Sequence, residues 1–376
     1  MMQIFPPSRP LLLYAAPKMA VLAAALILLA AKARAATFRV SSSQPESFQK
    51  IAGQLQPGDL VEAESGEYTG PLSFARAGTA EKPIVVRGLA REGRRPLIRG
   101  VGAMKGAAIV RFTGDHYRFE NFEVTARETE QVSRGIYIVA DDVTVTRCFV
   151  HDLAAQGVQV SDHAGSATLR AVEIARCGGG DKAHQVYAAS DFTKYPGAKF
   201  CMEACFLHDG RGGNNIKSRA AHTVLRDNWI EGAAFHELDL IGPDPGAQSP
   251  AAMAAVRQQF EVTNNTIIKR PGSRGLIARL GSDGLRDSNG DFCFAGNTFG
   301  LATPGGATLM KLRGAIAKIE MDRNVVWTMT GKPVRVFGSA PPFGYSLITG
   351  PGEGNWLPAK SSGFPPSWTG TQFFGK

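Results

Sequence analysis

From about residue 106 onward, apolar and polar residues alternate in short segments that end at turns. Alternation with a period of two is typical of half-buried β-strands, and no long helical period appears in this part of the chain. Two strand segments recur as a unit, and equivalent turns follow one another at 23 to 37 residues. The repetition predicts a solenoid in which each unit packs on its neighbours. One strand of each unit aligns as Val143–Cys148, Ala167–Val172, Phe200–Cys205, Val224–Asn228, Phe260–Asn265, Phe292–Asn297 and Ile319–Asn324.

The residue at the aligned turn is asparagine in the last four copies: Asn228, Asn265, Asn297 and Asn324. Asparagine tolerates left-handed backbone, and its amide forms hydrogen bonds with neighbouring main chain. Copies stacked at about 4.8 Å would form a buried ladder. An antiparallel sandwich would need hairpin signals and would not place asparagine at one offset. We therefore predict an all-β chain that folds as a right-handed parallel β-helix.

The two ends of the chain differ from this pattern. Ser43–Leu55 is predicted to be a short amphipathic helix that caps the N-terminal end of the solenoid. The segment from Ser339 onward is irregular and rich in proline and glycine, and we expect it to pack over the other end. The predicted organisation is a signal peptide at 1–35, a β-helix domain at 36–338 and an irregular tail at 339–376.

The N-terminal segment has the features of a secretory signal peptide. Basic Arg9 and Lys18 precede the apolar run Met19–Ala30, and Ala33-Arg34-Ala35 fits a signal peptidase site. The apolar run is shorter than the ~18–20 residues that a spanning helix needs, and no other segment is long and apolar enough to span a membrane. We expect a periplasmic or secreted protein that is cleaved near Ala35.

Composition and charge narrow the class of partner. The chain has 376 residues, of which 44% are hydrophobic and 20% are charged, as in globular proteins. Removing residues 1–35 takes away four basic residues and no acidic one, which lowers the net charge from +9 to +5. An exported, mildly basic protein favours an acidic polysaccharide as its partner over nucleic acid. We expect a monomer.

The five cysteines are too few and too irregularly placed for a disulfide framework. In the repeat register, Cys148 and Cys205 lie two coils apart, roughly 9–10 Å, which exceeds disulfide reach. Cys201 and Cys293 lie three coils apart. We expect neither pair to be bridged.

The other strand of each unit places a polar column on the outside of the solenoid. Ile216-Lys217-Ser218-Arg219 alternates, so Lys217 and Arg219 share one exposed face. With apolar residues inward, the outward column on successive coils reads Tyr137, Gln159, Tyr187, Lys217 and Asp239. A phenol, an amine and a carboxylate stacked in this way can bind a sugar acid and move its protons.

Histidines and loops gather beside this column. His184 and His236 adjoin the column strands, and long insertions follow Tyr187 and Asp239. His151 and His208 each belong to a Phe-x-His-Asp sequence, which indicates a repeated structural turn rather than catalysis.

Three segments carry a resemblance to a known family: Gly66-Glu67-Tyr68, Gly78–Ile84 and Asn215-Ile216-Lys217-Ser218. They resemble the β-helical polysaccharide lyases, which include alginate lyases and chondroitinase B. His184–Tyr187, Ile216–Ala220 and Glu237–Leu240 look closer still to a group of bacterial right-handed β-helix proteins. The resemblance implies that Lys217 matches the lysine that abstracts the C5 proton of a uronic acid.

The sequence also departs from these lyases. They place an acidic calcium pair just before the lysine, whereas this chain has Asn214-Asn215, so the expected calcium ligands are not evident. An arginine expected on the following coil is replaced around Glu237-Leu238-Asp239. Arg219 is the candidate for the missing positive charge.

β-Elimination needs a base at C5, neutralisation of the uronate carboxylate and an acid for the leaving oxygen. We assign Lys217 as the base, Arg219 as the carboxylate clamp, and Tyr187 or His184 as the acid. The predicted substrate-binding residues are Gln159, Asn215, His236, Glu237 and Asp239.

The predicted function is therefore cleavage of an acidic polysaccharide by a lyase. A uronate C5-epimerase and a non-catalytic glycan-binding or envelope scaffold protein are the alternatives. A glycoside hydrolase ranks third among the enzymes, after the lyase and the epimerase, because it needs paired carboxylates and Glu237 and Asp239 make a poor pair.

Overall fold

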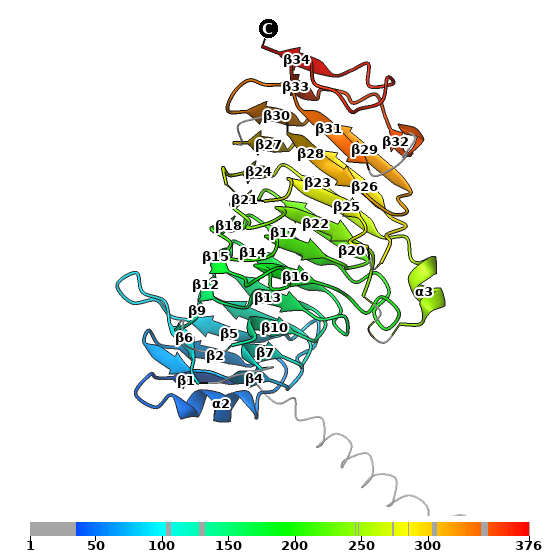
Figure 1. The fold of residues 1–376 in the computed structure, drawn as a ribbon. Helices are drawn as coiled ribbons and strands as arrows, with labels where there is room; N and C mark the ends of the chain where they lie inside the picture. The colour runs from blue at the N-terminus through cyan, green and yellow to red at the C-terminus, as the bar shows by residue number, and fades with distance from the viewer. Residues whose placement is uncertain are drawn as a thin grey trace, which may run out of the picture. The chain divides into compact units, whose positions relative to one another are not determined.

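The computed structural model describes residues 35–102, 107–127, 132–244, 246, 248–272, 274–284, 286–302, 307–339 and 345–375. The described strands pair in parallel and form three long sheets, which run along the stack of coils in Figure 1. From β2 to β31, each coil contributes one strand to each sheet, in the order A, B, C along the chain. The prediction of a right-handed parallel β-helix is confirmed.

Sheet A consists of β1 (Thr37–Val40), β2 (Leu60–Ala63), β5 (Ile84–Gly88), β8 (Tyr117–Glu120), β11 (Val143–Thr146), β14 (Ala167–Arg170), β17 (Phe200–Glu203), β20 (His222–Arg226), β23 (Gln259–Thr263), β26 (Asp291–Ala295), β29 (Lys318–Asp322) and β32 (Ile348–Thr349). Sheet B consists of β3 (Glu67–Thr69), β6 (Leu97–Gly100), β9 (Glu123–Ala126), β12 (Phe149–Leu153), β15 (Glu173–Cys177), β18 (Phe206–His208), β21 (Trp229–Glu231), β24 (Thr266–Lys269), β27 (Thr298–Leu301), β30 (Val325–Thr328), β33 (Trp356–Pro358) and β34 (Gln372–Phe374). Sheet C consists of β4 (Leu72–Phe74), β7 (Ala108–Phe112), β10 (Arg134–Ile138), β13 (Gln156–Val160), β16 (Val186–Ala188), β19 (Ile216–Ser218), β22 (Leu238–Ile241), β25 (Ala278–Gly281), β28 (Thr308–Leu312) and β31 (Arg335–Ser339).

Each coil therefore has three strands, whereas the sequence predicted a unit of two. The missing strand belongs to sheet B, which follows sheet A after a turn of only two residues, as between Thr146 and Phe149. So short a turn leaves almost no polar interruption in the sequence. The sheet A and sheet B strands therefore looked like one segment and its turn.

The asparagine ladder at this turn is confirmed, and it is one residue longer than predicted. The main-chain N–H of Asn228 donates to Oδ1 of Asn265, and the same bond links Asn265 to Asn297, Asn297 to Asn324 and Asn324 to Asn355, at 2.9 to 3.0 Å. All five side chains are buried. The ladder thus pairs main-chain donors that the turn removes from the sheets, which are costly to leave unpaired inside a protein.

The ladder asparagines do not themselves adopt left-handed backbone. Tolerance of that conformation, which we expected to explain them, is therefore not the reason for asparagine at these positions. The residue before each asparagine does adopt it: Asp227, Asn264, Gly296, Arg323 and Gly354 have φ between 55° and 68°. One left-handed residue bends the chain from sheet A to sheet B, and the next residue turns its side chain inward. Asparagine is therefore selected at this position for its amide group.

The N-terminal helix α2 (Glu46–Ala52) is shorter than the predicted segment. It lies beside the first strands in Figure 1, and its Phe48 is fully buried, with ring centroids 5.4 Å from Tyr68 and 6.0 Å from Phe74. Phe48 therefore contributes to the core at the end of the stack, as expected of a cap.

The segment predicted as an irregular tail contains a short 3₁₀ helix (Tyr345–Leu347) and the strands β32, β33 and β34, which extend sheets A and B. Residues 36–376 form one compact unit. The predicted signal peptide lies outside the described residues apart from Ala35. Within the described part of the chain, no helix has the length and apolar character needed to cross a membrane.

All five cysteines are free thiols, so neither of the two pairs considered from the sequence is bridged. Cys148, Cys177 and Cys205 are buried, and Cys201 and Cys293 are partly exposed.

Candidate functional site

The outer face of sheet C carries the predicted polar column. In the strand register, Tyr137 is opposite Gln159, Gln159 is opposite Tyr187, Tyr187 is opposite Lys217, and Lys217 is opposite Asp239. The predicted order of these five residues on successive coils is confirmed.

The column continues beyond Asp239 with Arg279, which the sequence analysis did not identify. The guanidinium of Arg279 donates two hydrogen bonds to the Asp239 carboxylate, at 2.7 and 2.8 Å. Asp239 also accepts a hydrogen bond from Nδ2 of Asn214 at 3.1 Å and is fully buried. The carboxylate is thus fixed in place by its own partners.

Lys217 stands at the centre of the column and is largely covered. Its side chain is 14% exposed, and Nζ lies 3.2 Å from Asp283 and 3.9 Å from Asp239. Nζ also lies 6.0 Å from the centroid of the Tyr187 ring. A phenol, an amine and a carboxylate therefore lie side by side on successive coils, as the alternation predicted.

Arg219 lies deeper than predicted. Its side chain is 4% exposed, although the sequence placed it on an exposed face with Lys217. It donates to the main-chain oxygen of Gly242 at 2.7 Å and to the carboxylate of Asp283. Two loops that follow β22 and β25 supply these groups and cover the guanidinium, which sequence periodicity alone did not indicate.

Tyr187 is held by the first of these loops. Its hydroxyl donates a hydrogen bond to Asp244. Burial, reinforced by the Asp244 carboxylate, raises the pKa of Tyr187 well above its usual range. The side chain is therefore a neutral phenol that can donate a proton to a strongly basic oxygen.

The two histidines beside the column are buried and neutral. Nδ1 of His184 accepts a hydrogen bond from the main-chain N–H of Asn214, and Nδ1 of His236 accepts one from Leu276, both at 3.0 Å. Burial lowers the pKa of each ring to about 4. With Nδ1 accepting, the ring proton of His184 is on Nε2. Near neutral pH the His184 ring is therefore not an imidazolium, because burial keeps its pKa at about 4.

The histidines predict a specific acid sensitivity. Unfolded histidine binds a proton below pH ~6.5, whereas the folded rings do so only near pH 4, so stability is lost as the pH falls through this interval. At pH 5, each of the two rings should lower the free energy of unfolding by about 2 kcal/mol. Replacing His184 with glutamine, which can still accept the Asn214 N–H, should reduce the loss of unfolding free energy between pH 7 and pH 5 by about that amount. The comparison requires urea unfolding of both proteins at the two pH values.

The control for this experiment is the substitution His163→Gln, because the side chain of His163 is 55% exposed. This variant should keep the pH dependence of the wild-type protein. Equal pH dependence in the His184→Gln variant and the wild-type protein would contradict the assignment of a buried neutral ring.

Asn215 and Glu237 do not belong to the outer column, although both were predicted to bind substrate. Nε2 of Gln185 donates to Asn215 at 2.8 Å, and Nδ2 of Asn215 donates to Glu237 at 2.6 Å. Both side chains are completely buried. They lie just before strands β19 and β22, at the turn from sheet B, where the alternation of the strand does not yet apply.

Lys269 lies at the end of the buried hydrogen-bonded chain that Gln185, Asn215 and Glu237 form. Its Nζ lies 3.4 Å from Glu237 and also donates to the main-chain oxygens of Ala233 and Phe235. Burial raises the pKa of Glu237 to about 7 and lowers the pKa of Lys269. The pair is therefore a structural element beneath the column.

Gln159 lies in the column, but its side-chain oxygen already accepts a hydrogen bond from another residue. Nε of Arg134 donates to its Oε1, and the Arg134 guanidinium lies 4.4 Å from the centroid of the Tyr137 ring. Gln159 is one coil from Tyr187 and two from Lys217.

The asparagines that replace the acidic pair of the lyases do not fit calcium. Oδ1 of Asn214 accepts the main-chain N–H of His236 at 3.0 Å, and Oδ1 of Asn215 accepts from Gln185. Their oxygens are thus committed to protein donors. No group of three or more His, Cys, Asp or Glu residues within the described ranges is arranged to hold a metal ion.

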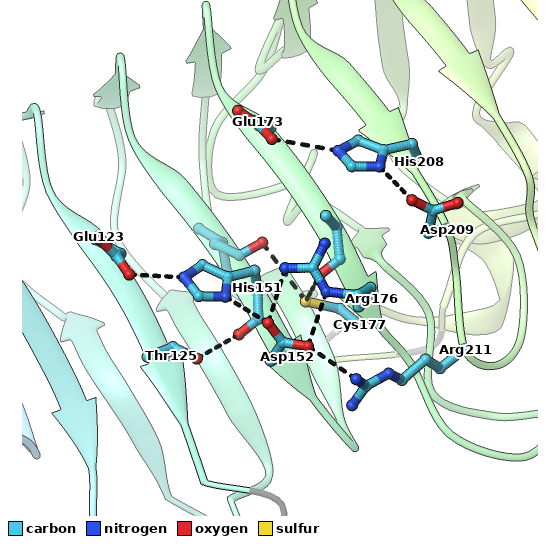
Figure 2. Close-up of polar contacts among 12 residues, drawn as sticks. Glu123, Thr125, His151, Asp152, Glu173, Arg176, Cys177, His208, Asp209 and Arg211 are labelled. Carbon is cyan, nitrogen blue, oxygen red and sulfur yellow. Dashed lines mark hydrogen bonds and ion pairs between the residues drawn. The ribbon is translucent and has the colours of Figure 1, made fainter.

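The outer face of sheet B carries a separate polar network, which is drawn in Figure 2. Nε2 of His151 lies 2.9 Å from Glu123, and Nδ1 lies 2.7 Å from Asp152. Asp152 in turn accepts hydrogen bonds from Arg176 and Arg211 at 2.8 Å. These groups lie on successive coils and connect them.

His208 repeats this arrangement, with Nε2 3.3 Å from Glu173 and Nδ1 2.7 Å from Asp209 (Figure 2). Asp152 and Asp209 both have left-handed backbone, with φ of 55° and 53°. Both ring nitrogens of each histidine are paired. The contacts agree with the interpretation of Phe-x-His-Asp as a structural turn.

No protein-family model matches the chain, and no curated protein matches it. Among solved structures, the chain is similar to an alginate lyase from Paenibacillus sp. str. FPU-7, with a TM-score of 0.53 and 17% identity over 84% of this chain and 98% of that one. It is also similar to the catalytic unit of a GH87 alpha-1,3-glucanase from Streptomyces thermodiastaticus strain HF3-3, with a TM-score of 0.50 and 13% identity over 92% of this chain and 70% of that one. The resemblance to β-helical polysaccharide lyases is confirmed at the level of the fold, and a fold alone does not select a reaction.

Proposed function

We propose that this chain is an exported lyase that cleaves a uronate-containing polysaccharide by β-elimination. The observation that carries the proposal is the stacking of Tyr187, Lys217 and Asp239 in register on the outer face of sheet C, with Arg219 beside Lys217. A phenol that stays protonated, an amine and a guanidinium within one site match the acid, the base and the carboxylate clamp that the reaction needs.

In the proposed reaction, Nζ of Lys217, as a neutral amine, takes the C5 proton of the uronate. The electrons of the C5–H bond form the C4=C5 double bond, and the C4–O bond breaks. The leaving oxygen takes the proton of the Tyr187 hydroxyl. The proton held on Lys217 then returns to the Tyr187 phenolate, which restores both side chains.

Arg219 makes the C5 proton acidic in this proposal. An anionic carboxylate next to C5 opposes the carbanion that forms there, and a guanidinium that pairs with the carboxylate removes this opposition. Asp239 is fixed by Arg279 and Asn214, so it limits the position of the Lys217 amine without moving itself.

Export and substrate charge complete the proposal. Residues 1–35 have the composition of a secretory signal, and the chain that remains after its removal is basic. A basic exported protein attracts anionic glycans. The fold shared with an alginate lyase is compatible with this role.

The experiment is incubation of the mature protein with alginate, glucuronan, pectate and glycosaminoglycans. The expected product absorbs in the ultraviolet because it contains an unsaturated uronate. Absence of this absorbance with all four polymer classes would refute the lyase assignment. NMR spectra of the recovered polymer would then identify C5 epimerisation without cleavage.

A further inference from the structure

A single carboxylate, that of Asp283, holds both cations that the proposed reaction assigns to the substrate. Its Oδ2 lies 3.2 Å from Nζ of Lys217, and the same atom accepts a hydrogen bond from Nη2 of Arg219. The Asp283 side chain is 8% exposed, so these contacts are shielded from water. A carboxylate thus already occupies the point where the cations converge.

These contacts leave Arg219 incompletely paired. Its Nε lies 3.2 Å from Oδ1 of Asp244 but has no hydrogen-bond partner of suitable geometry, although the atom is buried. A buried guanidinium nitrogen without a partner is costly, and a second acceptor at this position would stabilise it. A ligand carboxylate has two oxygens and can bind a guanidinium through both.

We propose that Asp283 occupies, in the free protein, the position of the substrate's uronate carboxylate, and that an acidic saccharide binds by displacing it. The inference rests on the proposed function, because it takes the ligand to be a uronate. It assigns the Lys217–Arg219 pair as a carboxylate-binding site whose occupant changes when substrate arrives.

The placement of the surrounding carboxylates explains why Asp283 is the one to leave. Asp239 is on strand β22, where Arg279 and Asn214 hold it. Asp283 is on the loop after β25, between Gly281 and Gly284, whose φ angles are 95° and 94°. Glycine takes such angles without strain and allows the backbone between them to change conformation.

The exchange makes the site selective for charge. A uronate replaces one carboxylate with another, so the ion pair of Arg219 is regained, and the Lys217 amine is released from Asp283 to face C5. A neutral sugar has no group that compensates for the loss of Asp283, so it is rejected. Asp283 thereby acts as a competitor that only an acidic ligand overcomes.

The test measures binding of alginate, glucuronan, pectate and glycosaminoglycan hexamers by isothermal titration calorimetry, with cellohexaose as the neutral probe. The Asp283→Asn variant should bind at least one acidic hexamer at least about fivefold more tightly than the wild-type protein, the lower end of typical coupling between competing events. Cellohexaose should bind neither protein. The matched control is Asp291→Asn, which removes a carboxylate paired with Arg257 outside the column and should leave the affinity unchanged.

A second variant keeps every charge in place, in case Asp283→Asn does not fold. Gly284→Ala forces a side chain onto left-handed backbone, destabilises the observed loop conformation and should also tighten binding. Measurable binding with equal or weaker affinity in the folded variants would overturn the displacement of Asp283 while leaving the lyase proposal intact. No binding of any acidic hexamer by any of the proteins would overturn both.

Discussion

Replacing Lys217 with alanine is expected to lower kcat at least about 10²-fold on the polymer that the protein cleaves, the usual contribution of a positioned acid or base. The amine at the centre of the column is the group assigned to the C5 proton, and its neighbours Asp239 and Asp283 are the carboxylates that it pairs with. Lys217→Arg should lose similar activity, because arginine keeps the charge but does not deprotonate. Rates of ultraviolet absorbance increase provide the measurement.

Binding separates this result from a non-catalytic role. The catalytic assignment expects Lys217→Arg to retain affinity for the oligosaccharide while turnover is lost. In a glycan-binding protein, Lys217→Ala would only weaken affinity, and salt would reduce the difference. The control is Lys311→Ala, which removes a lysine from the same column on the coil beyond Arg279. Full activity in Lys217→Ala would exclude the lysine as base.

Replacing Lys269 with alanine is expected to lower the free energy of unfolding by about 3–5 kcal/mol, the range for breaking a buried ion pair. Glu237 would remain fully buried, and its principal cation would be gone. The same change removes the donor to the main-chain oxygens of Ala233 and Phe235. Chemical denaturation at pH 7, monitored by circular dichroism, measures the loss.

A double substitution tests the reason for this loss. Glu237→Gln combined with Lys269→Met removes both charges and keeps an amide that can accept from Ala233 and hydrogen-bond Asn215. The double variant should recover most of the stability, because removing a whole buried pair is often close to neutral. A loss in the double variant as large as in Lys269→Ala would show that packing, and not the unpaired carboxylate, explains the effect.

The fold was predictable because each coil carries its own register signal. The apolar alternation and the asparagine offset placed Asn228, Asn265, Asn297 and Asn324 on successive coils, and hydrogen bonds join them as expected. The sheet B strands were missed because a turn of two residues separates them from sheet A. Alternation identifies a strand but does not locate a bend that adds almost no polar residue.

The candidate site was predictable where residues belong to strands. Tyr187, Lys217 and Asp239 followed from alternation, and Arg279 was available from the same signal in Ala278-Arg279-Leu280. Alternation failed for Glu237, which precedes its strand and faces the buried hydrogen-bonded chain. It also gave no information on Asp283, because this residue is in a loop, and the direction of a loop side chain does not follow the alternation of a strand.

The asparagine ladder also bears on how the chain acquires its structure. Each ladder bond joins residues 27 to 37 positions apart, so each bond connects two neighbouring coils in the C-terminal half of the solenoid. The last completed coil presents the unpaired main-chain N–H of its ladder asparagine, and the next segment pairs correctly only when the Oδ1 of its own asparagine reaches this donor. A shift of one residue would set an amide against apolar side chains and leave main-chain donors unpaired. The ladder therefore acts as a template that corrects each coil as it is added, and folding is expected to spread along the solenoid by sequential growth.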